Sequence, residues 1–143
     1  MIPHSRFRRL ALTLALSGCV AAPPSFPKPS ASSHAEGIDA ADLDILADAA
    51  VDLVRRQASA ANPIIGLEPA GDDRFARHLA DKLNGAGYSV TTGDRLRYQV
   101  GPVGDAVMLR ISIDGRDCAR LYARGADGRL GPAGPLSVRS AGP

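Results

Sequence analysis

The hydrophobic pattern of the chain changes its period near residue 88, and this change constrains the fold more than any other feature. Before it, apolar residues recur every three or four positions, which is the period of a helix that buries one face. After it, apolar and polar residues alternate, which is the period of a strand with one buried face. Helices of the first kind can cover a sheet of the second kind, so the pattern predicts an α+β fold with two layers.

The first helix is predicted over residues 38–57, where the apolar residues form a single stripe. Asp39 or Asp42 is the expected N-cap. Acidic residues fill the early turns and Arg55 and Arg56 end the helix, an order that suits the helix dipole.

A β-α-β unit is predicted next. Residues 64–67 indicate a short strand, and a second helix is expected to begin after Asp72 or Asp73. Gly85 or Gly87 can supply the left-handed conformation at its end. The strand that follows this helix would complete the unit, parallel to the strand before it.

An antiparallel meander is predicted for the rest of the domain, because Asp-Gly pairs at residues 114–115 and 127–128 are typical of tight turns between strands. The strands of the unit and the meander are expected at residues 88–92, 96–100, 106–114, 118–124 and 136–138. The predicted order is therefore a helix, a β-α-β unit and an antiparallel meander.

Residues 1–18 are predicted to be a lipoprotein signal peptide. Three arginines precede a short apolar run, which ends in Leu-Ser-Gly-Cys at residues 16–19, a match to the bacterial lipobox. Cys19 is therefore the expected lipidation site, with an S-diacylglycerol group and, after cleavage, an N-acyl group on its amine. More than one acyl chain is needed for stable anchoring. The apolar run is shorter than the roughly 20 residues of a membrane-spanning helix.

Residue 20 is Val and not Asp, which by resemblance to Gram-negative lipoproteins favours transport to the outer membrane, with the protein facing the periplasm. Residues 19–36 are rich in Pro, Ser and Ala and are predicted to be a lipidated, extended tether. Residues 37–139 are expected to form the α+β envelope domain, and residues 140–143 a frayed tail.

The net charge of +2 comes from the signal peptide. Without residues 1–18 the chain has 14 basic and 15 acidic side chains, with the acids concentrated in the first helix and arginines in the later strands. This balance, with no set of aromatic residues among the arginines, argues against direct binding of nucleic acid.

The predicted domain contains few side chains that could serve as catalytic residues. His78 is the one histidine of the predicted domain and is expected on the solvent side of its helix. Cys118 is expected to be buried and inert, or to form an intermolecular disulfide, because lipidation consumes Cys19. Asp48 and Asp52 lie one turn apart, but a solvated acidic face explains them better than a paired-carboxylate site. We therefore expect no enzyme, no metal, no small-molecule substrate and no cofactor beyond the covalent lipid on Cys19.

Four arginines could share the outer face of the sheet and dock an acidic partner, since arginine is enriched at interfaces. A solvated face that protects the strands from aggregation is the alternative and is favoured. These arginines are Arg97, Arg110, Arg120 and Arg124.

The chain resembles the conjugal transfer protein TrbH family. The run Phe75-x3-Leu79-x3-Leu83-x3-Gly87-Tyr88-x-Val90 carries the resemblance, together with Leu96-x-Tyr98, the alternating strands and the lipobox. The resemblance implies a lipoprotein of the mating-pair-formation apparatus, a conjugative type IV secretion system. It implies no catalytic residue.

The resulting hypothesis is an outer-membrane lipoprotein that helps to assemble the conjugation machinery. Its expected partners are membrane lipid, through the acyl chains of Cys19, and other proteins of the conjugation channel. A scaffold or activator of another envelope complex, such as cell-wall synthesis, is the second hypothesis, and a periplasmic enzyme is the third and least favoured.

Overall fold

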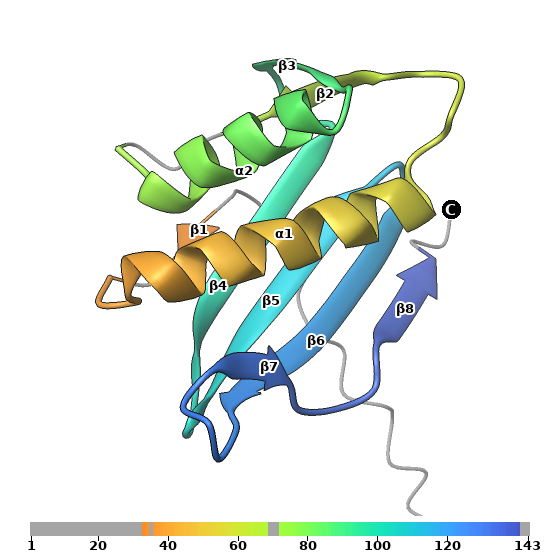
Figure 1. Cartoon of the computed structure of the whole chain (residues 1–143). Coiled ribbons are helices and arrows are strands. Elements are labelled where there is room, and N and C mark those ends of the chain that lie inside the picture. The colour runs from red at the N-terminus through yellow and green to blue at the C-terminus, as the bar shows by residue number, and fades with distance from the viewer. Residues whose placement is uncertain (1–32, 35, 69–71, 141–143) are drawn as a thin grey trace, which may run out of the picture.

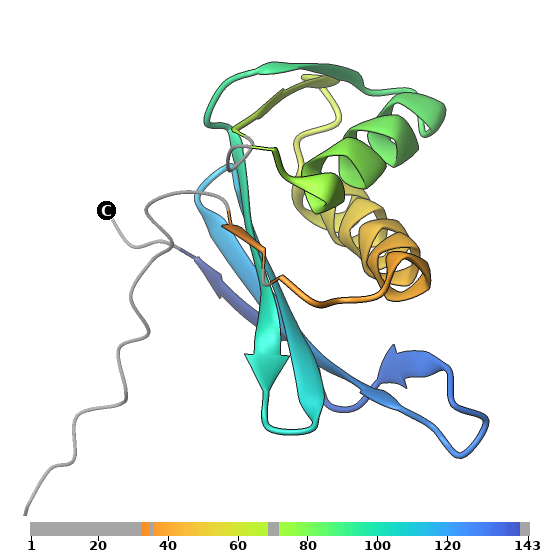
Figure 2. The same cartoon turned by 90° about the vertical axis from the view of Figure 1, so that its left-hand side faces the viewer.

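The domain has two layers, with two helices on one face of a mixed β-sheet (Figures 1 and 2). This computed structural model describes residues 33–34, 36–68 and 72–140. The helices are α1 (Ala40–Gln57) and α2 (Arg74–Gly85), which pack against each other. The α+β prediction is therefore confirmed. Neither helix in the described ranges combines the length and hydropathy needed to cross a membrane.

The sheet runs in the order β3-β2-β4-β5-β6-β7, with β1 beside β4 and β8 beside β6. Strands β4, β5 and β6 form the predicted antiparallel meander, and β7 and β8 both pair antiparallel with β6. The strands are β1 (Ser33–His34), β2 (Ile64–Leu67), β3 (Ser89–Thr92), β4 (Leu96–Val103), β5 (Ala106–Ile113), β6 (Arg116–Arg124), β7 (Leu130–Pro132) and β8 (Ser137–Ser140).

The predicted β-α-β unit is formed by β2, α2 and β3, with β2 and β3 parallel. The chain then passes from β3 to the other side of β2, where β4 pairs with it at Leu67 and Leu96. This passage is tight, because a Cβ on Gly66 would lie 3.1 Å from the Cα of Gly93. Glycine suits such a close approach of two backbones, because any side chain on Gly66 or Gly93 would press against the other strand connection.

At the helix ends the structure agrees with the sequence patterns and shows which of the candidate capping residues is used. Asp39 is the N-cap of α1, and Asp73 is the N-cap of α2. Gly87, at a φ of 93°, supplies the left-handed residue after α2. The hairpin turn between β5 and β6 has positive φ at both Asp114 and Gly115, as a type I′ turn requires.

Three short strands differ from the predicted boundaries. β1 pairs parallel with β4 although its residues fall in the predicted tether 19–36, and β8 includes Ser140 of the predicted tail 140–143. β7 was not predicted, because Leu130-Gly-Pro132 is too short to show a period. Each of these strands exists through pairing with a longer one. The signal peptide, Cys19 and residues 141–143 lie outside the described residues.

The core lies between the helices and the inner face of the sheet. Its sheet side consists mainly of alternate residues of β4 and β5, with further buried residues from β2, β6 and β7. The residues of β4 and β5 are Leu96, Tyr98, Val100, Leu109, Ile111 and Ile113. Its helix side consists mainly of Leu43, Leu46, Ala47, Ala50, Val54, Phe75, Leu79 and Leu83. The rings of Phe75 and Tyr98 meet with centroids 4.9 Å apart, which joins α2 directly to β4.

Buried hydrogen bonds to Asp73 fix the position of α2 relative to β4, which the apolar contact alone would leave less specific. Asp73 is 2% exposed, and its Oδ1 accepts a hydrogen bond from the backbone N–H of Phe75 at 2.8 Å. Its other oxygen accepts a hydrogen bond from the hydroxyl of Tyr98. One carboxylate therefore caps α2 and positions the start of that helix over β4.

We predict that Tyr98→Phe lowers the free energy of unfolding by about 1–2 kcal/mol, because it removes a donor from a buried carboxylate. Urea unfolding measures the change. Tyr88→Phe is the matched control, since the Tyr88 hydroxyl donates no hydrogen bond to any described residue. Equal losses in the two variants would contradict the role of the Asp73 contact.

Candidate docking surface

The sheet register separates the four arginines that the sequence places on one face. Gln99 faces Arg110 and Arg97 faces Ser112 across β4 and β5, so Arg97 and Arg110 share the outer face, away from the helices. Arg120 faces the buried Leu109 and lies on the helix side of the sheet, and Arg124 has the same parity in β6. The expectation of one shared face is therefore wrong for Arg120 and Arg124.

The physical reason lies in the composition of β6. One set of alternate residues contains Cys118, Arg120 and Tyr122, and the other contains Ala119, Leu121 and Ala123. Each set includes apolar residues, so a period of two does not reveal which set is buried. Pairing with β5 decides the matter by placing Cys118 opposite Ile111.

The two outer-face arginines are accompanied by acids. Arg97 lies 3.3 Å from the carboxylate of Asp94 and 3.9 Å from that of Glu68. Arg110 forms an ion pair with Asp117 in which the side chains are 11% and 18% exposed. Arg97 Nε and Asp117 Oδ1 are buried and make no hydrogen bond within the described structure. The outer face is therefore a mixed polar surface, not a uniformly positive one.

Arg120 and Arg124 bind parts of their own chain. The Nε of Arg120 donates a hydrogen bond to the carbonyl of Gly134 at 3.0 Å, which holds the connection between β7 and β8. The guanidinium of Arg124 pairs with Asp42 and lies 3.5 Å from Asp39. It also donates a hydrogen bond to the carbonyl of Gly128 at 2.9 Å.

Arg124 lies in a cleft of ≈ 440 Å³ at the N-terminal end of α1. Its lining combines apolar and charged residues, which come from the start of α1, the β4–β5 hairpin, the end of β6 and β7. It is lined by Glu36, Gly37, Ile38, Asp39, Asp42, Pro102, Asp105, Val107, Ala123, Arg124 and Leu130, and we call it the acidic cleft.

The acidic face of α1 is partly used for packing against α2. Lys82 of α2 lies 3.0 Å from Asp44 and 2.9 Å from Asp48, and hydrogen bonds with these two carboxylates raise the pKa of Lys82. His78 lies 3.8 Å from Asp44 with its side chain 36% exposed. Asp52 lies 3.7 Å from Arg55 instead. Asp48 and Asp52 therefore have different basic partners.

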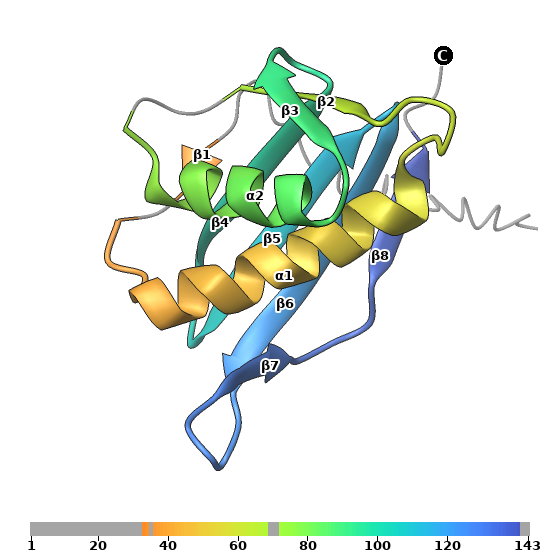
Figure 3. The ribbon, with the colours of Figure 1, turned by 45° about the horizontal axis from the view of Figure 1, so that its top comes forward.

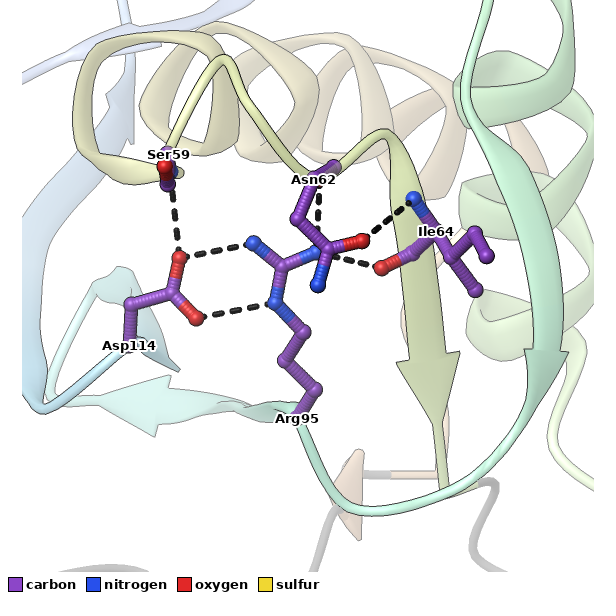
Figure 4. A network of polar contacts seen from close by, with 5 residues as sticks. All are labelled: Ser59, Asn62, Ile64, Arg95 and Asp114. Carbon is purple, nitrogen blue, oxygen red and sulfur yellow. Dashed lines mark hydrogen bonds and ion pairs between the residues drawn. The ribbon is translucent and has the colours of Figure 1, made fainter.

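A polar network centred on Arg95 holds together the opposite end of the domain (Figure 4). The guanidinium binds the carboxylate of Asp114 in two places, at 2.8 and 2.7 Å. It also donates to the carbonyls of Asn62 and Ile64. The backbone N–H of Ser59 donates to Asp114 at 3.1 Å.

This network joins the α1–β2 connection, the β3–β4 connection and the β5–β6 turn. The hydrogen bond from Arg95 is the main cause that lowers the pKa of Asp114. Sequence reasoning identified residues 114–115 only as a turn. The ion pair was missed because its two residues are 19 positions apart and the turn motif at Asp114 carries no signal for a partner at Arg95.

Cys118 is buried, with no exposed surface, and it is a free thiol. Burial raises the pKa of this thiol, so less thiolate is available for nucleophilic or disulfide chemistry. Of the two alternatives for Cys118, the structure favours the buried residue over an intermolecular disulfide. In the described residues, no three side chains of His, Cys, Asp or Glu are grouped as a metal site would need.

Comparison with known proteins links the chain to one family. The family model described as conjugal transfer protein TrbH matches residues 26–141, which include both helices and all eight strands. Neither a curated protein nor a solved structure matches the chain.

We predict that Asp114→Asn costs about 1 kcal/mol of stability at neutral pH, because an amide cannot replace the ionic contact with Arg95. Asn also tolerates the φ of 48° at this position, so backbone strain is not added. Because the pKa of Asp114 is lowered on folding, its contribution is complete above the ordinary pKa of 3.8 and is lost as the pH falls through the lower folded value.

Urea unfolding at neutral pH and at about pH 3 tests this prediction, and the difference between wild type and variant should shrink in acid. Asp94→Asn is the control, since the Asp94 side chain is 78% exposed. A difference that stays constant with pH would show that the ionised form of Asp114 does not supply the stability.

Proposed function

Because the chain belongs to the TrbH family of conjugal transfer proteins, we propose that it is a structural or assembly component of a conjugative type IV secretion system. The match over residues 26–141 identifies a component of conjugal transfer and is the observation that carries the proposal. The position in the envelope and the mode of action are parts of the proposal. The lipobox, the fold and the surface of the domain support them.

The proposed anchor is the lipid on Cys19. The arginine-rich start, the short apolar run and the lipobox at residues 16–19 are the features of an exported lipoprotein. Val20 favours the outer membrane as the destination. Residues 20–32 then connect the anchor to β1, the first described strand. In this arrangement the domain acts in the periplasm, close to the outer membrane.

The proposed mode of action is binding to other proteins and not catalysis. Cys118 is enclosed in the core, where a substrate could not reach its sulfur. His78 lies beside Asp44 at the edge of the interface between α1 and α2, where Lys82 binds the same carboxylate. By contrast, the outer sheet face and the acidic cleft present charged and apolar groups together, as protein interfaces do.

Deletion of the gene from a transfer-proficient plasmid is expected to abolish or strongly reduce conjugation. Mating frequency is the measurement, and the intact gene supplied in trans should restore it. The copy number and maintenance of the plasmid are the controls, because they should not change. A mating frequency that is unaffected by deletion would overturn the proposed role in transfer.

Replacement of Cys19 is expected to release the protein from the membrane. The diacylglyceryl group is attached to the sulfur of Cys19, which Cys19→Ser removes. The variant should therefore leave the outer-membrane fraction and should not be labelled with palmitate. Cys118→Ser is the matched control and should keep both properties. Retention of Cys19→Ser in the outer membrane would show that another element holds the protein there.

A further inference from the structure

Helix α1 lies across the face of the sheet (Figure 3). Groups of opposite charge lie at its two ends, and both groups include residues from other elements. Its 18 residues span about 27 Å at a rise of 1.5 Å per residue. The acidic cleft lies at the N-terminal end. At the other end lies a group of three exposed arginines, which we call the basic end: Arg55, Arg56 and Arg116.

The basic end is built from the last turn of α1 and the start of β6. The guanidinium of Arg116 donates a hydrogen bond to the side-chain oxygen of Gln57 at 3.1 Å, which places it beside the helix terminus. No carboxylate in the described residues forms an ion pair with Arg56 or Arg116. The nearby carboxylate of Asp114 is already bound by Arg95. Arg55 lies 3.7 Å from Asp52, so the charge of the basic end that no ion pair within the described residues balances is that of Arg56 and Arg116.

The acidic cleft presents the opposite excess. Glu36, Asp39, Asp42 and Asp105 line it, and Arg124 is its one lining base. Arg124 is already engaged by Asp39 and Asp42, so Glu36 and Asp105 are left at the exposed rim. Apolar residues, among them Ile38, Val107 and Leu130, line the rest of the cleft. Such a groove suits an occupant that carries both positive charge and apolar surface.

The helix dipole does not account for this distribution by itself. It favours acids in the first turn of α1 and bases in the last turn, which covers Asp39, Asp42, Arg55 and Arg56. Glu36 precedes the helix, Asp105 belongs to the β4–β5 turn and Arg116 belongs to β6. Their addition extends each group from a helix terminus to a surface formed by several elements.

We propose that the protein associates with copies of itself head to tail, with the basic end of one copy seated in the acidic cleft of the next. The charges of the two surfaces are complementary. Exposed apolar surface also lies near the basic end, because Val138 in β8 is 49% exposed and lies on the strand whose end pairs with Arg116. A twofold dimer through either surface would instead place like charges against each other.

This geometry defines the type of assembly. The two surfaces lie at opposite ends of α1. A reciprocal twofold dimer with antiparallel α1 helices would place both surfaces on one neighbour and would stop at two copies, whereas the proposed head-to-tail contact does not close in this way. Each copy instead binds two neighbours, and the contact generates a chain or a closed ring. The inference concerns the purified protein, so it stands or falls separately from the proposed role in transfer.

Sedimentation equilibrium of the full-length lipidated protein in detergent, over a range of protein concentrations, tests this proposal. Wild type should form species larger than dimers at about 50 mM salt and dissociate at about 500 mM. The basic-end variant is Arg56→Ala with Arg116→Ala, and the cleft variant is Glu36→Gln with Asp105→Asn. Each variant alone should bind itself at least about tenfold more weakly than wild type.

An equimolar mixture of the two variants provides the decisive measurement. The intact cleft of the first variant and the intact basic end of the second can form one native contact, so the mixture should form heterodimers and stop there. Arg74→Ala with Asp81→Asn is the matched control, since both residues are exposed on α2 outside the two surfaces and this variant should associate like wild type. Circular dichroism establishes that all variants are folded.

Three results would overturn the proposal. The first is a wild-type protein that stays monomeric, or that forms dimers and nothing larger, at low salt. The second is association that survives in either neutralised variant. The third is a mixture of the variants that fails to form heterodimers although wild type associates, since that pattern would place the contact on other surfaces.

Discussion

The apolar inner face of β4 and β5 is the constraint on which the rest of the structure depends. Alternate residues of these strands, such as Tyr98 and Ile111, are fully buried because both helices lie on them. Isolated helices of this length are marginal in water, so α1 and α2 are stable mainly through this contact. The carboxylate of Asp73 then orients α2 by binding Tyr98, and the Arg95 network closes the opposite end of the domain.

This packing also decides which charges face the outside. The helix face of α1 that carries Asp44 and Asp48 meets Lys82 of α2, so part of its acidity is neutralised within the domain. What remains is the rim of the acidic cleft at one end of α1 and the exposed arginines at the other. The proposed role in transfer depends on such surfaces, because the core provides stability and the exposed groups provide recognition.

The sequence predicted elements better than it predicted the candidate site. Long periodic segments such as α1 and β5 have many residues that repeat the same signal, whereas β1 and β7 have two or three residues and exist only through pairing with β4 and β6. The prediction that four arginines share one face was wrong for a related reason. Arg120 and Arg124 occupy a strand with apolar residues on both faces, so only its neighbour determines which way each arginine points.

The sequence by itself determined the α+β class, the order of the two helices and the longer strands, a pair of candidate N-caps for each helix, and the resemblance that the family match bears out. These properties depend on local periodicity and on residues within a few positions of one another. The tertiary structure alone decided that Cys118 is buried, that Arg95 binds Asp114 and that Arg124 meets the start of α1. These depend on strand register and on contacts between distant segments, for which a single sequence carries no local signal.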